Sequence, residues 1–293
     1  MKAYKSLSNS NDILLFRPDK NLDRLEISIN RLEMIGGHDI SLNKKELLEC
    51  ITQLIKLDEK WIPEGEGYSM YIRPVVIGTH PYLGVAPPSE ALLYVITSPV
   101  GPYYKGGFQP VRLTADVPFV RAWPGGSGYS KLGANYGPTI LASTTASQQG
   151  YDQVLWLYDD YITEVGTMNV FFALKTDSGI ELVTPPLHTR DDILPGITRL
   201  SIIELVQQYP AEENITVSER DITMSEIKQA IYDDRLLEAF GAGTAAVVSP
   251  ISCIRYKGED LSIPATGDLT KRIWKDITDI QYGKVEHEWS YKV

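Results

Sequence analysis

A cluster of prolines and glycines divides the chain into two parts whose hydrophobic patterns differ. Residues 99–107 read PVGPYYKGG and hold the densest turn-forming chemistry in the sequence. Before this segment, helical spacing gives way to β-branched runs, and after it short apolar strands are interrupted by helices. Because 293 residues suffice for two ordinary domains, we expect two mixed α/β domains. A small one covers residues 1–98, an interdomain loop covers 99–107, and a larger, sheet-dominated one covers 108–293.

Regular spacing of apolar residues locates the main elements. Leucine and isoleucine recur at helical spacing over residues 21–34 and 44–57, and Asn43 with Glu46 forms a capping box for the second helix. Strands are predicted at 71–78, 91–97, 154–158, 169–174, 217–220 and 245–256, and further helices at 199–208, 225–233 and 268–280. The helix near 199 follows Leu194-Pro195-Gly196, so its first backbone amides are available to an anion.

The charge and the cysteine content exclude several classes of protein. Asp and Glu number 38 against 28 Lys and Arg, a formal net charge of -10 that disfavours nucleic acid and anionic membranes as partners. The two isolated cysteines, Cys50 and Cys253, make neither a disulfide framework nor a CxxC pair, and the four histidines show no metal-ligand spacing. The first residues lack the apolar stretch of a signal peptide. We therefore expect a soluble intracellular protein without a metal site, in the cytoplasm or the mitochondrial matrix, of which the cytoplasm is favoured for the chain as given.

A glycine-rich loop, Gly125-Gly-Ser-Gly-Tyr-Ser, delivers Lys131. It is not a phosphate-binding Walker loop, because Ser precedes the lysine and Leu follows it. An ordinary surface loop has this composition, and so does a loop that holds a lysine of lowered pKa as a nucleophile or Schiff-base former. Tyr136 follows closely, as a core aromatic residue or as a phenol aimed at the atom that Lys131 attacks.

Two further segments have both a structural and a functional interpretation. Glu164 is the one carboxylate in the weakly charged segment 162–169, ITEVGTMN. It is either a solvated edge residue or a buried acid that needs a cationic partner, such as a protonated ring nitrogen. Gly241-Ala-Gly-Thr244 is either a turn or an anion-binding nest of backbone amides backed by a hydroxyl group.

The order of these segments resembles one known family, the branched-chain amino acid aminotransferases of the eukaryotic type, which are fold-type IV pyridoxal-phosphate enzymes. The combination of KLGANYG, ITEVGTMN and LPGITR is specific to it, and the likeness covers nearly the whole chain. The segments that carry it are FRPDKNLDRL (16–25), YIRPVVIG (71–78), RAWPGGSGYSKLGANYGPT (121–139), QVLWLYDDYITEVGTMN (153–169), TPPL (184–187), ILPGITR (193–199), FGAGTAAVVSP (240–250), IQYG (280–283) and HEW (287–289).

The resemblance implies a cofactor site. Lys131 matches the lysine that binds pyridoxal 5'-phosphate covalently and shuttles a proton, Glu164 the carboxylate that pairs with the ring nitrogen, and Tyr136 the phenol bonded to the ring oxygen. Four more residues match the phosphate cup: Arg24, Ile197, Thr198 and Thr244.

The resemblance also implies the substrate side. Tyr71 matches a pocket wall, and Arg73 the guanidinium that binds the distal carboxylate of glutamate or 2-oxoglutarate. Thr167, Thr244 and Ala245 match positions near the substrate α-carboxylate, and Tyr103 falls in the family's mobile interdomain loop. The implied activity is ping-pong transfer of the amino group between Leu, Ile or Val and 2-oxoglutarate, giving branched 2-oxo acids and glutamate, by a homodimer.

Other activities remain open at this point. A D-amino acid transaminase and a lyase of an aminated chorismate derivative share the fold, although ITEVGTMN and YIRP argue against both. A catalytically impaired, cofactor-binding paralogue or isoform that acts as a partner subunit is the alternative of a different class. It follows from a departure from the family, because Met1-Lys-Ala-Tyr aligns with the middle of the family's small domain and roughly its first half is expected to be absent.

A second departure concerns regulation. Some animal members carry a CxxC redox switch after the Gly-Thr turn, where this chain has Ala246 and Ser249. Cys253 lies just past this segment and does not restore the pair. We therefore expect no such thiol regulation.

Overall fold

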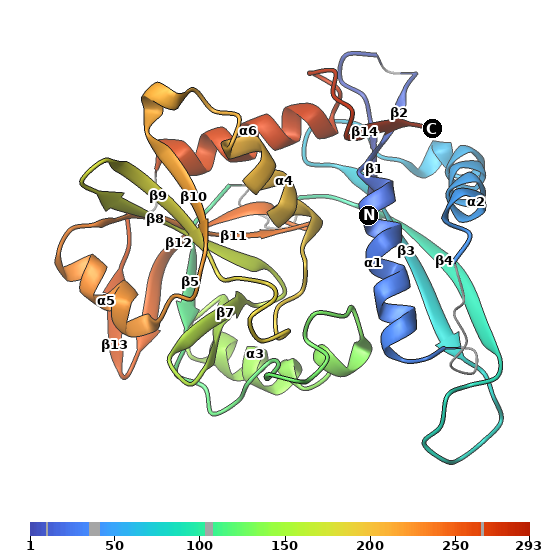
Figure 1. Cartoon of the computed structure of the whole chain (residues 1–293). Coiled ribbons are helices and arrows are strands. Elements are labelled where there is room, and N and C mark those ends of the chain that lie inside the picture. The colour runs from blue at the N-terminus through green and yellow to red at the C-terminus, as the bar shows by residue number, and fades with distance from the viewer. Residues whose placement is uncertain (10, 35–41, 103–107, 265–266) are drawn as a thin grey trace. The chain divides into compact units, whose positions relative to one another are not determined.

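The computed structural model describes residues 1–9, 11–34, 42–102, 108–264 and 267–293 (Figure 1). The chain forms two compact units. Unit 1 consists of residues 1–103 and 278–293, and unit 2 of residues 104–277. The mixed α/β class is confirmed, because each unit has its own sheet and its own helices.

Unit 1 is an antiparallel sheet covered by helices on one face. The sheet has the order β14-β2-β1-β3-β4 and the helices pack through a shared apolar core, in which Leu15 and Ile72 of the sheet meet Leu22 of α1 and Ile51 of α2. The elements are β1 (Lys2–Lys5), β2 (Ile13–Phe16), α1 (Pro18–Arg31), α2 (Lys44–Leu57), the 3-10 turn η1 (Glu59–Trp61), β3 (Ser69–Gly78), β4 (Ala91–Val100) and β14 (Ser290–Lys292).

Residues 278–293 belong to unit 1, whereas the sequence predicts them to be part of the second domain. Strand β14 pairs antiparallel with β2, so that Ser290 lies opposite Phe16. Trp289 packs edge-on against Phe16 at 6.0 Å between ring centroids, and the Arg17 guanidinium lies 4.6 Å above the Trp289 ring. The Arg17 amide also donates to the Trp289 carbonyl at 2.8 Å. These contacts, made far along the chain from β2, explain the difference.

The two predicted helices of this unit are present. Helix α2 has the predicted bounds, and the Asn43 side chain accepts a hydrogen bond from the Glu46 amide at 3.2 Å, as the capping box requires. Helix α1 begins earlier than predicted, at Pro18, because proline at the first helical position has its φ angle already set and needs no amide donor. The predicted interdomain loop, 99–107, lies only partly within the described residues, of which 99 and 100 end β4.

Unit 2 is built on a mixed sheet in the order β10-β9-β8-β11-β12-β5-β6-β7, with β13 added beside β12. Its strands are β5 (Val111–Thr114), β6 (Gln153–Tyr158), β7 (Tyr161–Val165), β8 (Asn169–Thr176), β9 (Gly179–Thr184), β10 (Ile215–Glu219), β11 (Leu236–Gly243), β12 (Val247–Tyr256) and β13 (Glu259–Ser262). Its helical elements are η2 (Gly133–Asn135), α3 (Thr139–Gln148), α4 (Ile197–Val206), η3 (Ala211–Glu213), α5 (Met224–Tyr232) and α6 (Asp268–Gln281), the last of which continues past the unit boundary.

The centre of this sheet brings two of the sequence motifs together. Strands β8 and β11 are almost wholly buried, and Phe171 stacks on Phe240 with 5.1 Å between ring centroids. Their antiparallel register places Ala242 opposite Asn169. The end of ITEVGTMN and the start of the Gly-Thr turn are therefore neighbours, although they are distant in sequence.

Neither a membrane span nor a metal cluster is found in the part of the chain that the structure describes. No described helix is long and apolar enough to cross a membrane. No group of three or more described His, Cys, Asp or Glu side chains is arranged to hold a metal ion.

The N-terminus of α6 is capped by a buried glutamate from the sheet, which generates a stability prediction. Glu238 of β11 accepts hydrogen bonds from the amides of Leu269 (3.3 Å) and Thr270 (2.8 Å) and from the Thr270 hydroxyl. A carboxylate there also interacts favourably with the helix dipole. We expect Glu238→Gln to lower the free energy of unfolding by about 1–2 kcal/mol, measured by urea denaturation followed by circular dichroism. Glu212→Gln, an exposed change of the same kind, is the control, and equal losses in both variants would contradict the prediction.

Candidate active site

Lys131 and Tyr136 lie side by side at the end of the glycine-rich loop. The Lys131 ammonium donates a hydrogen bond to the Tyr136 hydroxyl at 2.9 Å, and its nitrogen lies 4.9 Å from the centre of the tyrosine ring. The turn η2 between them folds the chain back, which brings the two side chains together. Lys131 is exposed and Tyr136 half-buried, so the amine is accessible to a ligand. The structure thus brings this predicted pair together.

Asn135 fixes the backbone around this lysine. Its side chain is buried, and its amide nitrogen donates to the carbonyls of Ser127 (2.7 Å) and Ser130 (2.8 Å). Its oxygen accepts from the Ser127 hydroxyl at 3.0 Å. Asn135 was not among the predicted site residues. The one signal for it was its place inside KLGANYG, between two residues that were assigned roles.

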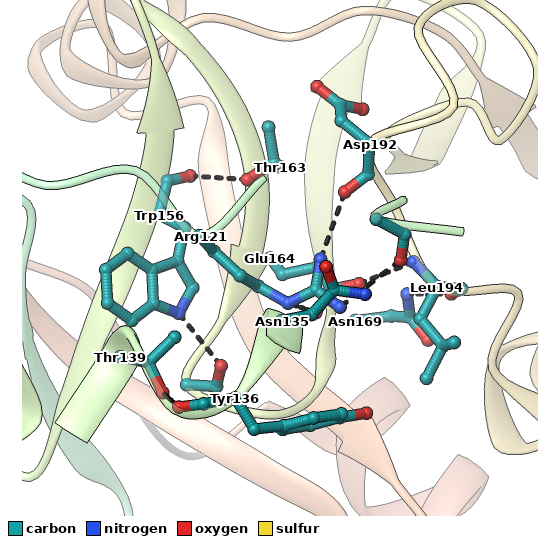
Figure 2. A network of polar contacts seen from close by, with 12 residues as sticks. Arg121, Asn135, Tyr136, Thr139, Trp156, Thr163, Glu164, Asn169, Asp192 and Leu194 are labelled. Atoms are coloured by element: carbon teal, nitrogen blue, oxygen red, sulfur yellow. Dashed lines mark hydrogen bonds and ion pairs between the residues drawn. The ribbon is translucent and has the colours of Figure 1, made fainter. Parts of the chain in front are cut away.

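Glu164 is buried and paired, which excludes the solvated-edge interpretation. It lies on β7, and its Oε2 atom is 2.9 Å from Nε of Arg121, with the two side chains 3% and 2% exposed (Figure 2). Its Oε1 atom accepts a hydrogen bond from the Leu194 amide at 2.7 Å. A buried carboxylate needs a cationic partner, and within the protein that partner is Arg121. The segment that contains Arg121 carried the family resemblance, but no function was predicted for the arginine itself.

Arg121 ties three segments to this carboxylate. Its Nη1 atom donates to the Asp192 carbonyl at 3.0 Å, and its Nη2 atom to the Gly128 carbonyl at 3.4 Å. The loop that contains Asp192 and the glycine-rich loop pass very close, because a Cβ atom on Gly128 would lie 2.4 Å from the Asp192 carbonyl oxygen. The absence of a side chain at Gly128 is therefore required for both loops to reach Arg121.

The strand that carries Glu164 is held by a buried tryptophan. Trp156 of β6 lies opposite Glu164 in the β6–β7 pairing, and its indole donates to the Gly166 carbonyl at 2.8 Å. The Thr163 hydroxyl donates to the Trp156 carbonyl at 3.1 Å (Figure 2). These bonds leave the carboxylate on a rigid hairpin rather than on a loop.

The electrostatics of Glu164 reflect competing effects. Burial, the largest, raises the pKa of its carboxyl group above the ordinary value, and the Asp192 carboxylate raises it further. The Arg121 guanidinium, the Leu194 amide and the Lys131 ammonium lower the pKa. The net direction is upward. The Lys131 ammonium thus acts on the carboxyl group of Glu164, and an added cation beside Glu164 would favour its ionised form.

Two backbone segments that suit an anion meet at Asn169. Helix α4 begins after Gly196, which has no side chain to cap it, and a Cβ atom on Gly196 would lie 2.0 Å from the Asn169 side-chain oxygen. The Asn169 amide donates to the Leu194 carbonyl at 2.9 Å, and Asn169 is also the register partner of Ala242 beside the Gly-Thr turn. The start of α4, with the predicted Ile197 and Thr198, and the turn with the predicted Thr244 and Ala245 therefore flank one asparagine.

The remaining predicted residues are placed as follows. Thr167 is exposed in the tight turn closed by the bridge between Val165 and Met168. Arg24 lies on α1 of unit 1, and Tyr71 and Arg73 lie two residues apart on β3 of that unit, with the guanidinium 5.2 Å from the tyrosine ring centre. Because strand side chains alternate, Tyr71 and Arg73 share one face. Tyr103 lies outside the described residues.

Comparison with known proteins shows which family this chain resembles. The family model described as amino-transferase class IV matches residues 6–254. A branched-chain-amino-acid aminotransferase of Dictyostelium discoideum is 50% identical over 99% of this chain and 75% of its own length.

Solved structures agree with that result. The branched-chain amino acid aminotransferase of Escherichia coli is 26% identical and superposes with a TM-score of 0.78 over 99% of this chain and 87% of that one. A branched-chain amino acid aminotransferase from the archaeon Thermoproteus uzoniensis, solved with norvaline, is 25% identical with a TM-score of 0.77, over 99% of this chain and 87% of that one. The chain therefore belongs to the class IV aminotransferases and, among them, to the branched-chain amino acid aminotransferases.

Proposed function

We propose that this protein transfers the amino group of leucine, isoleucine or valine to 2-oxoglutarate in two half-reactions, giving a branched 2-oxo acid and glutamate, with pyridoxal 5'-phosphate as its cofactor. The observation that carries the proposal is the hydrogen-bonded pair of Lys131 and Tyr136 together with Glu164, a buried carboxylate fixed on both oxygens. Membership of the class IV aminotransferases and the relatives that share half of this sequence support it.

The residues present fit the chemical groups of this cofactor. Lys131 provides an amine for the aldehyde, and Tyr136 a phenol for the ring oxygen. Glu164 is a buried carboxylate and suits a protonated ring nitrogen, because burial disfavours its charge and a neighbouring cation stabilises it. The start of α4 and the Gly-Thr turn offer backbone amides to a phosphate. When bound, the cofactor supplies an electron sink for the electrons released at the amino acid Cα.

The protein's own side chains then have separable tasks. Lys131 moves a proton, because its nitrogen is accessible and its hydrogen bond to the Tyr136 hydroxyl orients it. Glu164 keeps the ring nitrogen protonated, because its ionised form is stabilised by a cation at its surface. Arg121 and the Leu194 amide hold that carboxylate in one orientation.

The remaining predicted residues have proposed roles in substrate and phosphate binding. Tyr71 is an apolar wall for the branched side chain, and Arg73 binds the distal carboxylate of 2-oxoglutarate or glutamate. Thr167, Thr244 and Ala245 lie near the substrate α-carboxylate, and Tyr103 belongs to the interdomain loop that the family resemblance implies. Arg24 serves the cofactor phosphate with Ile197, Thr198 and Thr244. The compartment, cytoplasm or mitochondrial matrix, stays a prediction.

We also propose that the protein works as a homodimer. The loop between β3 and β4 exposes three large side chains: Tyr82 is 65% exposed, Leu83 106% and Val85 110%. A second copy would remove this apolar surface from water. Light scattering coupled to size-exclusion chromatography should give twice the chain mass, and a monomer at micromolar concentration would contradict this.

The half-reactions test the function directly. The protein is reconstituted with pyridoxal phosphate, and leucine alone is added. We expect the visible band of the lysine-bound cofactor to convert to the absorption of the amine form, and 2-oxoglutarate to restore it. D-leucine should give no conversion. A reconstituted protein that converts with the D-amino acid but not with leucine would refute the proposed substrate class.

Lys131→Ala should abolish the visible band and lower glutamate formation by roughly 1,000-fold or more, because it removes the covalent attachment and the proton carrier together. Lys175→Ala, a change at an exposed lysine near the end of strand β8, is the control and should leave both unchanged. Normal turnover by the Lys131 variant would overturn the assignment of this site.

Glu164→Gln should retain the cofactor but lose most of the rate, roughly 100-fold or more, because a neutral amide does not keep the ring nitrogen protonated. Equilibrium dialysis measures the bound cofactor and a coupled glutamate assay the rate. Glu226→Gln, at a glutamate of α5 that pairs with Arg220, is the control.

The same substitution has a pH-dependent effect on stability. Since the folded carboxyl pKa of Glu164 is raised, the wild-type apoprotein loses stability as pH rises from the ordinary carboxyl pKa of the unfolded chain to the raised pKa of the folded protein, and the loss is complete above that value. The difference in unfolding free energy between wild type and Glu164→Gln should therefore move in favour of the variant as pH rises. A difference that stays constant from pH 4 to 8 would contradict the raised pKa.

A further inference from the structure

Residues 190–194 form a loop that contacts both members of the buried ion pair. The Leu194 amide donates to Glu164 Oε1 at 2.7 Å, and the Asp192 carbonyl accepts from Arg121 Nη1 at 3.0 Å (Figure 2). The Asp191 carbonyl accepts from the Tyr129 amide of the glycine-rich loop at 3.1 Å. The position of this loop therefore decides whether both hydrogen bonds to the pair are made.

Arg190 braces the loop from outside. Its Nε atom lies 3.1 Å from Asp192 Oδ2, and its Nη1 atom lies 2.6 Å from Asp221 Oδ1. Its guanidinium also lies 4.9 Å from the ring centre of Tyr161, the first residue of the strand that carries Glu164. Arg190 thus links the loop to Asp221 and to β7 at the same time.

The partner of Arg190 within the loop is a buried charge. The Asp192 side chain is 1% exposed and that of Arg190 11%, so water screens this pair poorly. The Oδ1 atom of Asp192 is buried without a hydrogen-bond partner among the described residues. Its charge is therefore offset mainly through Oδ2, by Arg190. An Asp192 carboxylate without that cation would act on Glu164 with its full negative charge.

We infer that Arg190 is a positioning residue for the buried carboxylate of this site. It holds the 190–194 loop so that the Leu194 amide and the Asp192 carbonyl reach Glu164 and Arg121. It also offsets the charge of the Asp192 carboxylate, which otherwise disfavours the ionised form of Glu164. Its effect on catalysis rests on the proposed function, whereas its effect on Glu164 does not.

Several charged groups face Glu164, and a test must separate their effects on its pKa. They are Arg121, Lys131, Arg199 at the start of α4, and Asp192. Of these only Asp192 raises the pKa of Glu164. Arg190 pairs with Asp192, so its removal should act on Glu164 in the direction of that carboxylate, toward a higher pKa.

The first experiment titrates Glu164 in the apoprotein by carbon NMR, with glutamate labelled at the side-chain carboxyl. The signal is assigned by its loss in Glu164→Gln. We expect Arg190→Gln to raise the titration midpoint by about 0.5–1 pH unit. In the double variant with Asp192→Asn the midpoint should return to or below the wild-type value, because the uncompensated charge is gone. If Arg190 had only a structural role, adding Asp192→Asn would not restore the titration midpoint of Glu164.

Arg220→Gln is the matched control. Arg220 also pairs with two carboxylates, Glu181 and Glu226, and its substitution changes the net charge equally. In this variant the titration midpoint of Glu164 should equal that of wild type. If Arg190→Gln does not fold, Asp221→Asn removes one anchor of Arg190 at a side chain that is 37% exposed and should shift the midpoint less in the same direction. The inference would be overturned if the titration midpoint of Glu164 in the folded Arg190→Gln variant equals that in Arg220→Gln. The same holds for Asp221→Asn where it replaces the Arg190 variant.

The second experiment uses the reconstituted enzyme. Arg190→Gln should lower kcat several-fold and move the acidic limb of the kcat–pH profile upward, while KM for leucine changes less than two-fold. If wild type does not transaminate, the proposed function fails, and the apoprotein titration still decides the role of Arg190. If wild type transaminates and the Arg190 and Arg220 variants share one pH profile, the inference fails and the proposed function stands.

Discussion

The buried ion pair between Glu164 and Arg121 is the interaction on which the site depends. Removing one member of such a pair costs about 3–5 kcal/mol, because the other charge is left in a medium of low dielectric. The pair persists because its atoms are satisfied in several directions: the Leu194 amide serves the carboxylate, and the carbonyls of Asp192 and Gly128 serve the guanidinium. This ion pair and its hydrogen bonds therefore hold strand β7, the glycine-rich loop and the 190–194 loop together.

Rigid neighbours keep that geometry in place. Glu164 lies on a hairpin closed by Trp156. Asn169 is the first residue of the buried strand β8, where it donates to the Leu194 carbonyl before α4 and pairs with Ala242, shortly before Thr244. At Gly128 and Gly196 the backbone lies so close to neighbouring residues that a side chain would not fit. The Glu164 carboxylate and the backbone segments for which we propose anion binding are therefore supported by one sheet.

Local patterns predicted the parts of this fold that depend on neighbours in sequence. The apolar spacing of residues 44–57 and the Asn43 cap give α2 its bounds, since both act within a few residues. The dielectric argument that a buried Glu164 needs a cation was correct. It did not lead to Arg121, because the contact joins distant segments that only the tertiary fold brings together.

The unpredicted features share a physical cause. Strands β1 and β2 have only four residues each, too few for a period of two to stand out, and the polar strand β14 is defined by its pairing rather than by its composition. The role of Asn135 depends on carbonyls that only the folded turn aligns. The family resemblance predicted roles for Lys131 and Tyr136, whose side chains are hydrogen-bonded in the structure, whereas the 190–194 loop and its arginine became visible only in the structure.

The pairing of β14 with β2 also orders events during synthesis. Strand β2 lies near the start of the chain, and its partner at residues 290–292 is made after all of unit 2. Until then β2 presents unpaired backbone groups along one side, and Arg17 and Phe16 lack the Trp289 ring that covers them. Unit 2 can complete its sheet on the ribosome first, so unit 1, although it begins earlier, is the later of the two to close.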